Sequence, residues 1–325
     1  MKLRSLGERE LVSSIREEFS AKGKDLILGI GDDAAVIRGA AGSCLLTTDL
    51  LIENVHFTAS LHPPRYLGRK SLNVNLSDIA AMGGRPRFAL LGLALRKGLG
   101  KAWVRGFFGG LKAAAMEAGV TLVGGDISAA KRIVVSITVI GEAGKFIRRS
   151  GARPGDLIFV SGYLGDAAAG LRLLRRGCRL GQDKMADHLL RAFLDPAPQI
   201  ALGLALSRSK AANAMIDTSD GLSVDLLHLC EESGTGAEID LDRLPLSPAI
   251  RALEKKPGRL ALHGGEDYQL LFAMSPGKLG LIAGLTKRFR LQQIGRMTRG
   301  KKIFVVDAKG RRLPLKAGGY EHLLE

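Results

Sequence analysis

Several short apolar segments of this chain run directly into aspartate residues. Leu45–Thr48 is followed by Asp49, and the glycine-rich turn Gly29–Gly31 is followed by Asp32 and Asp33. Apolar strands end where turn residues begin, so aspartates in this position collect at the ends of sheet strands. Carboxylates that several strand ends deliver to one place repel each other. The fold must therefore either keep these loops apart or gather them around a cation.

Strand and helix signals alternate along both halves of the 325 residues, a length that favours two domains. Hydrophobic periodicity in the first half predicts helices over Glu8–Phe19, from Pro63–Pro64 to Ile79 and over Trp103–Ala115, and strands over Leu26–Ile30, Cys44–Thr48, Phe88–Leu95, Val120–Val123 and Ile133–Ile140. The second half predicts strands over Leu157–Val160, Ala214–Ile216, Glu238–Leu241, Tyr268–Ala273 and Ile303–Val306, with helices from Asp166 to about Ser207, over Leu222–Glu232 and near Leu279–Leu285.

A polar, turn-rich segment over Arg148–Asp156 separates the two series. Such segments mark domain boundaries, so we place one domain over residues 1–147 and a second over 148–325. Mixed helices and strands in both halves indicate two α+β or α/β units. No apolar run approaches the roughly 18 to 20 residues of a membrane span. The three cysteines lack metal-ligand spacing, which is typical of reduced thiols in a cytoplasmic protein.

The net charge of +16 raises the question of a nucleic-acid partner. The basic residues are scattered along the chain, however, and aromatic residues make up only 5% of it, so no platform for stacking bases is evident. A solvated basic surface that helps to draw in anionic substrates fits this pattern better. The composition therefore argues against nucleic acid as the partner.

Two glycine-rich segments look like phosphate-binding motifs. Gly29–Ala34 matches the dinucleotide fingerprint, but two carboxylates stand where the pyrophosphate would lie, so a nicotinamide-dependent oxidoreductase rests on this match alone. Gly295–Lys302 matches a P-loop, yet it precedes a strand and ends in Lys302 instead of a hydroxyl residue. We interpret this second segment as a basic hairpin turn.

The aspartates carry the functional signal as a group. Any one of them, such as Asp220 before the helix at Leu222, could be a helix cap. Together their hard oxygen ligands suit Mg²⁺, which bridges carboxylates to substrate phosphates, and Thr47 and Thr48 add oxygens beside Asp49. The candidate ligands are Asp32, Asp33, Asp49, Asp78, Asp126, Asp217 and Asp220.

The motifs in which these residues stand resemble the thiamine-monophosphate kinase family. They are Gly29–Ala35, Thr47–Asp49, Asn54–Phe57, Asn75–Gly84, Gly124–Asp126, Arg149–Ala152, Ile216–Gly221 and Leu262–Tyr268. The resemblance covers nearly the whole chain in family order. It implies the two-domain α+β fold of the aminoimidazole ribonucleotide synthetase-like superfamily, with an N-terminal mixed sheet that pairs across a homodimer and a C-terminal α/β sandwich domain. It also implies ATP and thiamine phosphate as substrates, thiamine diphosphate as product, and several Mg²⁺ ions.

The resemblance also implies roles for single residues. Asp32, Asp49, Asp78, Asp126 and Asp217 match the magnesium ligands, Thr47 and Thr48 would assist, and Asp220 would hold a further ion. Gly125, Asp126, Arg149 and Ser219 match positions that contact ATP, and His56, Glu266 and Tyr320 match positions that contact the substrate. Ile127–Ser128 and Phe108 depart from the family pattern and leave some nucleotide contacts open.

Phosphoryl transfer between two anions needs alignment and charge neutralisation more than covalent help. We therefore expect no side-chain nucleophile, and Arg149 adds a fixed positive charge. Within the superfamily, a selenophosphate synthetase would need a reactive cysteine near a glycine-rich N-terminus, whereas Cys44 lies in an apolar strand. An aminoimidazole ribonucleotide synthetase-like activity is the other alternative.

Overall fold

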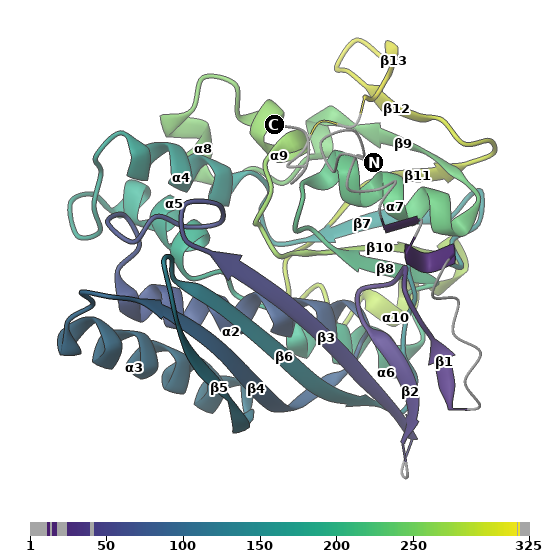
Figure 1. Ribbon diagram of the computed structural model, residues 1–325. Coiled ribbons are helices and arrows are strands. Elements are labelled where there is room, and N and C mark those ends of the chain that lie inside the picture. Colours follow the sequence, from purple (N-terminus) through teal and green to yellow (C-terminus); the bar gives the residue numbers. More distant parts are fainter. Residues whose placement is uncertain (1–11, 14, 18–24, 40–41, 317, 319–325) are drawn as a thin grey trace.

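The computed structural model describes residues 12–13, 15–17, 25–39, 42–316 and 318. Most of the helix expected over Glu8–Phe19 lies outside these residues, as does Tyr320. The described chain forms two mixed sheets with helices, joined by the segment of residues 144–156 (Figure 1). The α+β class is confirmed. A boundary at residues 147/148 remains our proposal, and it falls inside this connecting segment.

The first sheet has six strands in the order β1-β2-β3-β6-β4-β5, and only β4 and β5 are parallel. Its strands are β1 (Leu26–Leu28), β2 (Ala35–Gly39), β3 (Gly42–Ile52), β4 (Arg85–Arg96), β5 (Thr121–Ala130) and β6 (Val134–Ala143). Helices α2 (Pro64–Ala81) and α3 (Lys101–Ala118) cover one face and leave the other uncovered by the rest of the described chain (Figure 1). Helix α3 ends at Gly119, as the sequence predicts, in a left-handed conformation with φ 66°.

Strand β3 shows how the two faces differ. Its side chains alternate, so Leu45, Thr47, Asp49 and Leu51 face the helices, and Leu45 and Leu51 are buried there. Leu50 points to the open face and keeps 48% of its surface exposed. The acidic residue at the middle of β3 therefore points toward α2, not toward solvent.

The second sheet has seven strands in the order β13-β12-β9-β11-β7-β10-β8. Its strands are β7 (Leu157–Ser161), β8 (Ala214–Asp217), β9 (Gly236–Asp240), β10 (Leu270–Met274), β11 (Leu291–Thr298), β12 (Ile303–Val306) and β13 (Arg312–Pro314). Its α-helices are α4 (Asp166–Arg175), α5 (Lys184–Leu194), α6 (Ile200–Ser209), α7 (Leu222–Ser233), α8 (Pro248–Leu253), α9 (Pro257–His263) and α10 (Leu279–Ile282). Helices α7 and α9 pack on one face, α6 and α10 pack on the other, and α4, α5 and α8 form a separate cluster.

Helix α2 lies between the two sheets. Its residues Leu72 and Ile79 pack in the core of the first sheet, while Ala80 and Ala81 pack with α6 in the core of the second. A helix buried on most sides is normally apolar, yet α2 buries a lysine, two serines and two asparagines. Buried polar groups need partners, so this helix is where a functional site is expected.

One expectation about the second half needs correction. The segment Gly295–Lys302 is not a hairpin turn, because β11 and β12 lie on opposite sides of β9. A glycine at the start of β9 permits this crossing, since a Cβ on Gly236 would lie 2.4 Å from the Lys302 carbonyl oxygen. Strands β2 and β11 were not predicted, because β2 has only three apolar residues before Arg38 and Gly39, and β11 carries two adjacent glutamines, Gln292 and Gln293, and a glycine. No described helix has both the length and the apolar character needed to cross a membrane.

Candidate active site

The buried polar residues of α2 connect the two halves of the molecule. Ser77 donates a hydrogen bond from Oγ to Oδ2 of Asp217 at 2.6 Å, and Asp217 is the last residue of β8. Asn75 accepts a hydrogen bond from the backbone N–H of Asp49 at 2.9 Å. The Thr47 hydroxyl donates to Oδ2 of Asp78. The helix thus ties strand β3 of the first sheet to strand β8 of the second.

Three carboxylates meet where these elements join. One oxygen each from Asp33, Asp78 and Asp217 lies within 4.8 Å of the others, and we call these three residues the acidic centre. Arg149 donates from Nη2 to Oδ1 of Asp33 at 2.8 Å. The other Asp33 oxygen, Oδ2, is buried and has no hydrogen-bond partner among the described residues. A buried oxygen without a partner is costly in a folded protein, so it is available for a ligand.

Burial and mutual repulsion govern the acidity of this region. Burial, with the charges of Asp49 and Asp217, raises the pKa of Asp78 well above its usual value. Burial and the charge of Asp33 raise the pKa of Asp217 to about 8. Burial and the charge of Asp220 raise the pKa of Asp49 to about 6. With a pKa of about 8, the Asp217 carboxyl keeps its proton at neutral pH unless a cation replaces it.

The adjacent residues Asp32 and Asp33 have different partners, which the sequence did not reveal. Asp32 accepts hydrogen bonds from the backbone N–H of Arg149 at 3.2 Å, while its neighbour Asp33 turns into the acidic centre. Burial and the charge of Asp33 raise the pKa of Asp32 to about 7. The ligand set implied by resemblance contains Asp32 and omits Asp33. The role of Asp32 stays a prediction, and Asp33 is an addition from the structure.

Asp126 lies apart from the acidic centre within one chain. The cross-strand partners Asp49, Ile137, Leu91 and Gly125 form one row over β3, β6, β4 and β5. Three strand spacings separate the ends of this row, which is about 14 Å. Asp126, one residue later, points to the opposite, open face, where Ser128 donates to it at 3.3 Å. Its predicted metal role therefore requires a second chain or a ligand that spans this distance, and stays a prediction.

Three other positions that the sequence linked to ATP or metal, Gly125, Thr48 and Asp220, differ in how they lie relative to the acidic centre. Gly125 is required by packing, because a Cβ there would lie 1.9 Å from the Leu91 carbonyl oxygen of β4. Thr48 also points to the open face and donates to the Ile137 carbonyl oxygen. The N-cap residue of α7 is Gly221 and not Asp220, and the N–H of Gly221 donates to Asp225. Its charge does reach Asp49, which places it beside the acidic centre.

The candidate substrate residue Glu266 is held in an unusual way. Its backbone has a positive φ of 69°, and its N–H donates to the Ser219 carbonyl oxygen at 2.7 Å. Its carboxylate accepts from Nζ of Lys70 at 2.9 Å, and Lys70 is only 1% exposed. The same ammonium donates to the Phe193 carbonyl oxygen at 3.1 Å and lies 3.9 Å from that ring's centroid.

His56 is positioned by its own turn. Its Nδ1 accepts a hydrogen bond from the Ile52 N–H at 3.0 Å, so this nitrogen is unprotonated and Nε2 carries the proton in the neutral ring. Whether His56 contacts substrate stays a prediction. Tyr320 lies outside the described residues.

Sequence reasoning missed three residues that the structure brings to the site, namely Lys70, Ser77 and Tyr268. Burial and the charges of Glu266, Asp49, Asp217 and Asp78 raise the pKa of Tyr268 well above its usual value, so this residue lies near both Glu266 and the acidic carboxylates. Polar residues in an otherwise apolar helix could have pointed to Lys70 and Ser77. Tyr268 ends the motif Leu262–Tyr268, but the sequence assigned it no role of its own.

Comparison with known proteins agrees with this architecture. Residues 31–143 match the family model for the AIR synthase related protein N-terminal domain, and residues 153–308 match the model for its C-terminal domain. The thiamine-monophosphate kinase of Aquifex aeolicus is 38% identical over 95% of this chain and 99% of its own length. That of Escherichia coli K12 is 37% identical over 97% of this chain and 98% of its own length. A solved structure described as AaThiL complexed with AMPPCP and TMP superimposes with a TM-score of 0.88 at 36% identity, covering 99% of both chains.

The two matched domains, with carboxylates gathered between them, define a protein of the AIR synthase related class. Sequence identity of 37–38% to thiamine-monophosphate kinases over nearly the whole chain narrows the assignment from this class to one family. The chain belongs to the thiamine-monophosphate kinase family.

Proposed function

We propose that this protein transfers the γ-phosphoryl group of ATP to the phosphate of thiamine phosphate, forming thiamine diphosphate and ADP. The observation that carries the proposal is the acidic centre, which joins both domains in a chain that aligns along its length with thiamine-monophosphate kinases. The superimposed structure with an ATP analogue and TMP supports both substrates. A cluster of carboxylates repels the phosphates of both substrates unless bound cations neutralise its charge.

The residues present fit Mg²⁺. Asp33, Asp78 and Asp217 offer hard oxygen ligands, and Oδ2 of Asp33 lacks any other partner. Asp220 lies close enough to Asp49 to raise its pKa, and these two residues would extend the site to further ions, as would Asp32 beside Asp33. Bound Mg²⁺ supplies positive charge to the phosphates of both substrates, whose repulsion otherwise opposes the reaction. Thr47 keeps Asp78 oriented, and Ser77 does the same for Asp217.

The transfer itself needs no covalent intermediate on the protein. An oxygen of the acceptor phosphate attacks the γ-phosphorus, one P–O bond forms, and the P–O bond to ADP breaks with its electron pair. The acceptor oxygen is already deprotonated near pH 7, so no general base is required. Arg149 fixes Asp33 and holds a permanent positive charge near the acidic centre. Ser219 and Glu266 belong to one backbone-bonded unit, which would place ATP and substrate contacts side by side.

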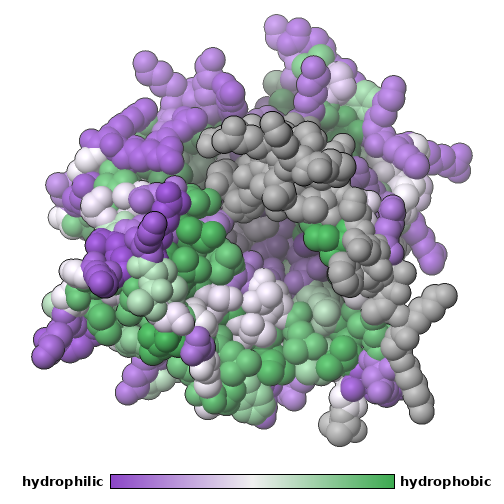
Figure 2. Space-filling model, viewed as in Figure 1, coloured by the Kyte–Doolittle hydropathy of each residue, from purple (hydrophilic) through white to green (hydrophobic). Residues whose placement is uncertain are grey.

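We propose that the active unit is a homodimer formed through the open face and edge of the first sheet. The whole of β5 is exposed, and it carries apolar residues with large exposed fractions, such as Val123 at 53% and Ile127 at 66%. Leu50 and Leu90 add apolar surface on the open face, and Figure 2 shows hydrophobic surface over the lower half of this view, where Figure 1 places the sheet. An exposed edge strand next to an exposed apolar sheet face is typical of a surface that binds another protein chain.

A second copy would also give Asp126 a role. Because Asp126 lies on the open face of the edge strand β5, a partner seated on that face and edge would receive this carboxylate against its bound nucleotide. The proposed site is then composite, with Asp78 from one chain and Asp126 from the other.

Mixing two inactive variants tests this arrangement. Asp78→Asn and Asp126→Asn homodimers should each be inactive. After dissociation and random reassociation in equal amounts, about a quarter of wild-type activity should return, because half of the dimers are mixed and each has one intact site of two. No recovery, with mixed dimers demonstrated by mass, would show that both residues act within one chain.

The reaction is tested by incubating the protein with ATP, Mg²⁺ and a panel of phosphorylated acceptors. Thiamine diphosphate should form only from thiamine phosphate, and formation should stop when Mg²⁺ is chelated. Phosphoryl transfer to a different acceptor alone would overturn the substrate assignment. A selenophosphate synthetase-like reaction has no support here, because Cys44 lies in β3 and burial raises the pKa of its thiol.

A further inference from the structure

A lysine is buried where helix α2, helix α5 and the loop that carries Glu266 meet. Lys70 is only 1% exposed. Its Nζ lies 2.9 Å from Oε1 of Glu266, 3.1 Å from the Phe193 carbonyl oxygen and 3.9 Å from the centroid of the Phe193 ring. An ammonium group has three N–H donors, and three groups of the protein surround this one. We call Lys70 and Glu266 the buried ion pair.

The end of helix α5 favours a cation at this place. Phe193 belongs to the last turn of α5, where carbonyl groups lack partners within the helix and carry the negative end of its dipole. The neighbouring imidazole adds no competing charge, because burial and the charge of Lys70 lower the pKa of His62 to about 3. The His62 ring packs against the Phe193 ring with 5.1 Å between their centroids. The ammonium is therefore held firmly on the α5 side.

The backbone on the other side of the ion pair is also held. The N–H of Glu266 donates to the Ser219 carbonyl oxygen at 2.7 Å. The next residue, Asp267, accepts hydrogen bonds from the backbone N–H groups of Gly165 and Ala167 at the start of α4, at 2.6 and 3.1 Å. Backbone contacts thus set the direction of the Glu266 side chain, and the buried ammonium fixes its far end.

This arrangement leaves one oxygen of the Glu266 carboxylate for a ligand. The ion pair uses Oε1, and the side chain keeps 29% of its surface exposed, so Oε2 can reach a ligand. A carboxylate oxygen only accepts hydrogen bonds, and its ligand must therefore offer a donor. The position adjoins the acidic centre, since the charges of Glu266, Asp78 and Asp217 all act on Tyr268. Because Lys70 balances the charge of Glu266, the pair adds no net charge that would repel a substrate phosphate.

Thiamine phosphate, the proposed substrate, has two groups that attract a carboxylate, namely the amino group of its pyrimidine ring and its positive thiazolium ring. A carboxylate that is already paired with an ammonium attracts a further cation less, whereas its free oxygen still accepts a directional hydrogen bond. We propose that Lys70 is a positioning residue, which holds one oxygen of Glu266 so that the other accepts a hydrogen bond from this amino group. The inference rests on the proposed function and names the part of the substrate that Glu266 recognises.

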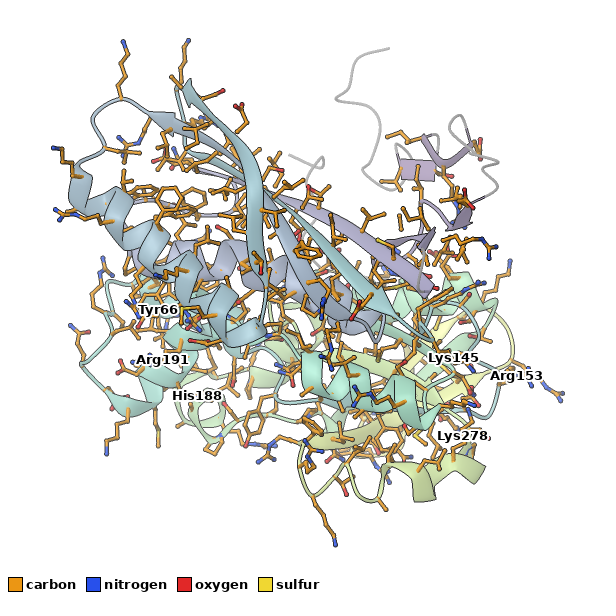
Figure 3. The ribbon with its side chains drawn as sticks, turned by 90° about the horizontal axis from the view of Figure 1, so that it is seen from below. Tyr66, Lys145, Arg153, His188, Arg191 and Lys278 are labelled. Carbon is orange, nitrogen blue, oxygen red and sulfur yellow. The ribbon has the colours of Figure 1, made fainter. Side chains whose placement is uncertain are left out.

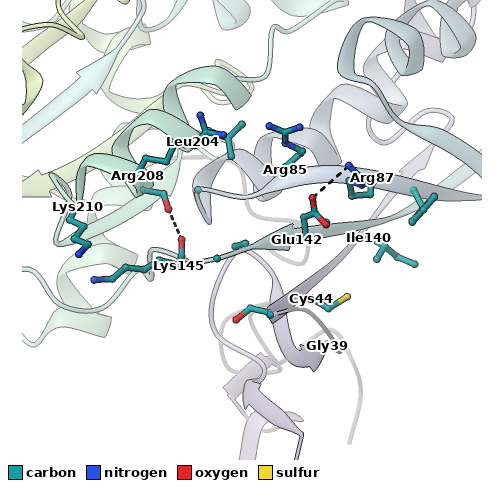
Figure 4. Close-up of a pocket in the computed structure, with 18 residues that line it drawn as sticks. Gly39, Cys44, Arg85, Arg87, Ile140, Glu142, Lys145, Leu204, Arg208 and Lys210 are labelled. Atoms are coloured by element: carbon teal, nitrogen blue, oxygen red, sulfur yellow. Dashed lines mark hydrogen bonds and ion pairs between the residues drawn. The ribbon is translucent and has the colours of Figure 1, made fainter.

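The buried ion pair lies away from the open face of the first sheet, where we place the homodimer contact. Helix α2, which carries Lys70, covers the opposite face of that sheet. Figure 3 shows Tyr66, about one turn before Lys70 in α2, on the opposite side of the view from Lys145 and Lys278. Neither member of the pair lines the cavity in Figure 4, whose walls include residues of the open face such as Cys44. A partner on the open face therefore does not cover the pair.

A comparison of two substrates tests the inference. They are thiamine phosphate and oxythiamine phosphate, in which an oxygen replaces the amino group. Lys70→Met removes the ammonium and keeps the length of the side chain. The matched control is Lys278→Met, because Nζ of Lys278 is also held by a carbonyl oxygen, that of Lys210 at 2.9 Å, and by a side-chain oxygen, that of Asn213 at 2.7 Å.

The wild-type protein should prefer thiamine phosphate in kcat/KM by about a hundredfold or more, because the analogue lacks the donor that the carboxylate requires. In Lys70→Met this preference should fall by at least about tenfold, with a higher KM for thiamine phosphate and an unchanged KM for ATP. Lys278→Met should keep the wild-type preference within about twofold. The ratio of two substrates on one protein does not depend on the folded fraction, so a merely structural loss leaves it unchanged.

A second variant tests whether Lys70 acts through Glu266. When Lys70→Met is added to Glu266→Ala, kcat/KM should change by less than about twofold. A further loss as large as in the wild-type background would show that Lys70 acts on its own and would overturn the inference.

Two other outcomes separate this inference from the proposed function. If wild type forms thiamine diphosphate but Lys70→Met loses activity equally with both substrates, the amino group is not what the pair recognises, and the inference alone fails. If wild type forms no thiamine diphosphate from thiamine phosphate, the proposed function fails and this inference fails with it.

Discussion

The acidic centre and a surface depression lined by eight basic residues, which we call the basic groove, both gather like charges from separate segments, but they do so in different surroundings. The basic residues of the groove are Arg85, Arg87, Lys145, Arg148, Arg153, Arg208, Lys210 and Lys278. The acidic centre is buried between two domains, and the pKa values of Asp78 and Asp217 are raised there. The basic groove is open to water. Two like charges about 4 Å apart repel by about 4 kcal/mol near a protein interior but by about 1 kcal/mol in water.

This difference decides what each region tells us about function. A buried cluster of carboxylates persists only if the remaining fold holds it in place, so it points to a ligand that the protein requires. An exposed cluster of basic residues is tolerated without any ligand, so its function rests on a direct binding measurement. Each prediction below changes one region and compares the response with the other.

The largest effect is expected from loss of one carboxylate in the acidic centre. Asp78→Asn should lower the rate of thiamine diphosphate formation by about a thousandfold or more, because a charged ligand to the proposed metal ions is lost from a buried site. Steady-state kinetics at saturating Mg²⁺ measure this. Asp242→Asn removes an exposed acidic residue and should leave the rate unchanged. Near-normal activity of Asp78→Asn would contradict the metal-bridged mechanism.

The same substitution, Asp78→Asn, should stabilise the metal-free protein although it inactivates the enzyme. Asp78 is surrounded by other carboxylates, and a neutral amide removes that repulsion while it can still accept the Thr47 hydrogen bond. We expect the free energy of unfolding without Mg²⁺ to rise by about 1–3 kcal/mol. Urea unfolding with a chelator measures it. The variant Lys145→Glu, Arg153→Glu and Arg208→Glu should show no comparable rise in the free energy of unfolding. A lower free energy of unfolding in Asp78→Asn would mean that the carboxylates do not repel each other.

The stability of the metal-free protein should fall as the pH rises from 7 to 8.5. The folded pKa values of Asp217 and Asp267 are about 8, far above the usual 3.8, so the folded state keeps protons that the unfolded state has released. Stability from such protons is lost as the pH passes the folded pKa, by about 1–2 kcal/mol over this interval. Thermal unfolding at several pH values tests this. Asp217→Asn, which retains Asp267, should show a shallower fall, and Mg²⁺ should stabilise wild type more at pH 8.5 than at pH 7.

The smallest effect is expected in the basic groove itself. Lys145→Glu, Arg153→Glu and Arg208→Glu together should change the free energy of unfolding by less than about 0.5 kcal/mol at 0.15 M salt, since exposed charges are screened. Urea unfolding at low and high salt measures it. A change of several kcal/mol would show that the groove is part of the structural core and would weaken the contrast drawn above.

Local patterns were sufficient to predict most elements. The α2 helix was placed from its opening prolines to Ile79, and the left-handed end of α3 at Gly119 followed from glycine's freedom there. The aspartate loops predict a metal site, which stays a prediction, and the motifs indicate the family that the comparisons show. These features depend on residues near each other in the chain, where periodicity and turn chemistry act directly.

What the sequence alone determined was therefore the residue types and their order: apolar strands, acidic loops and a chain that resembles one family throughout. Only the tertiary structure decided which of two adjacent aspartates, Asp32 or Asp33, enters the centre, and that Asp126 faces away from it. It also decided that distant basic residues line one groove. The physical reason is that strand alternation, sheet order and helix placement set side-chain directions and distances, and these depend on contacts between residues far apart in the chain.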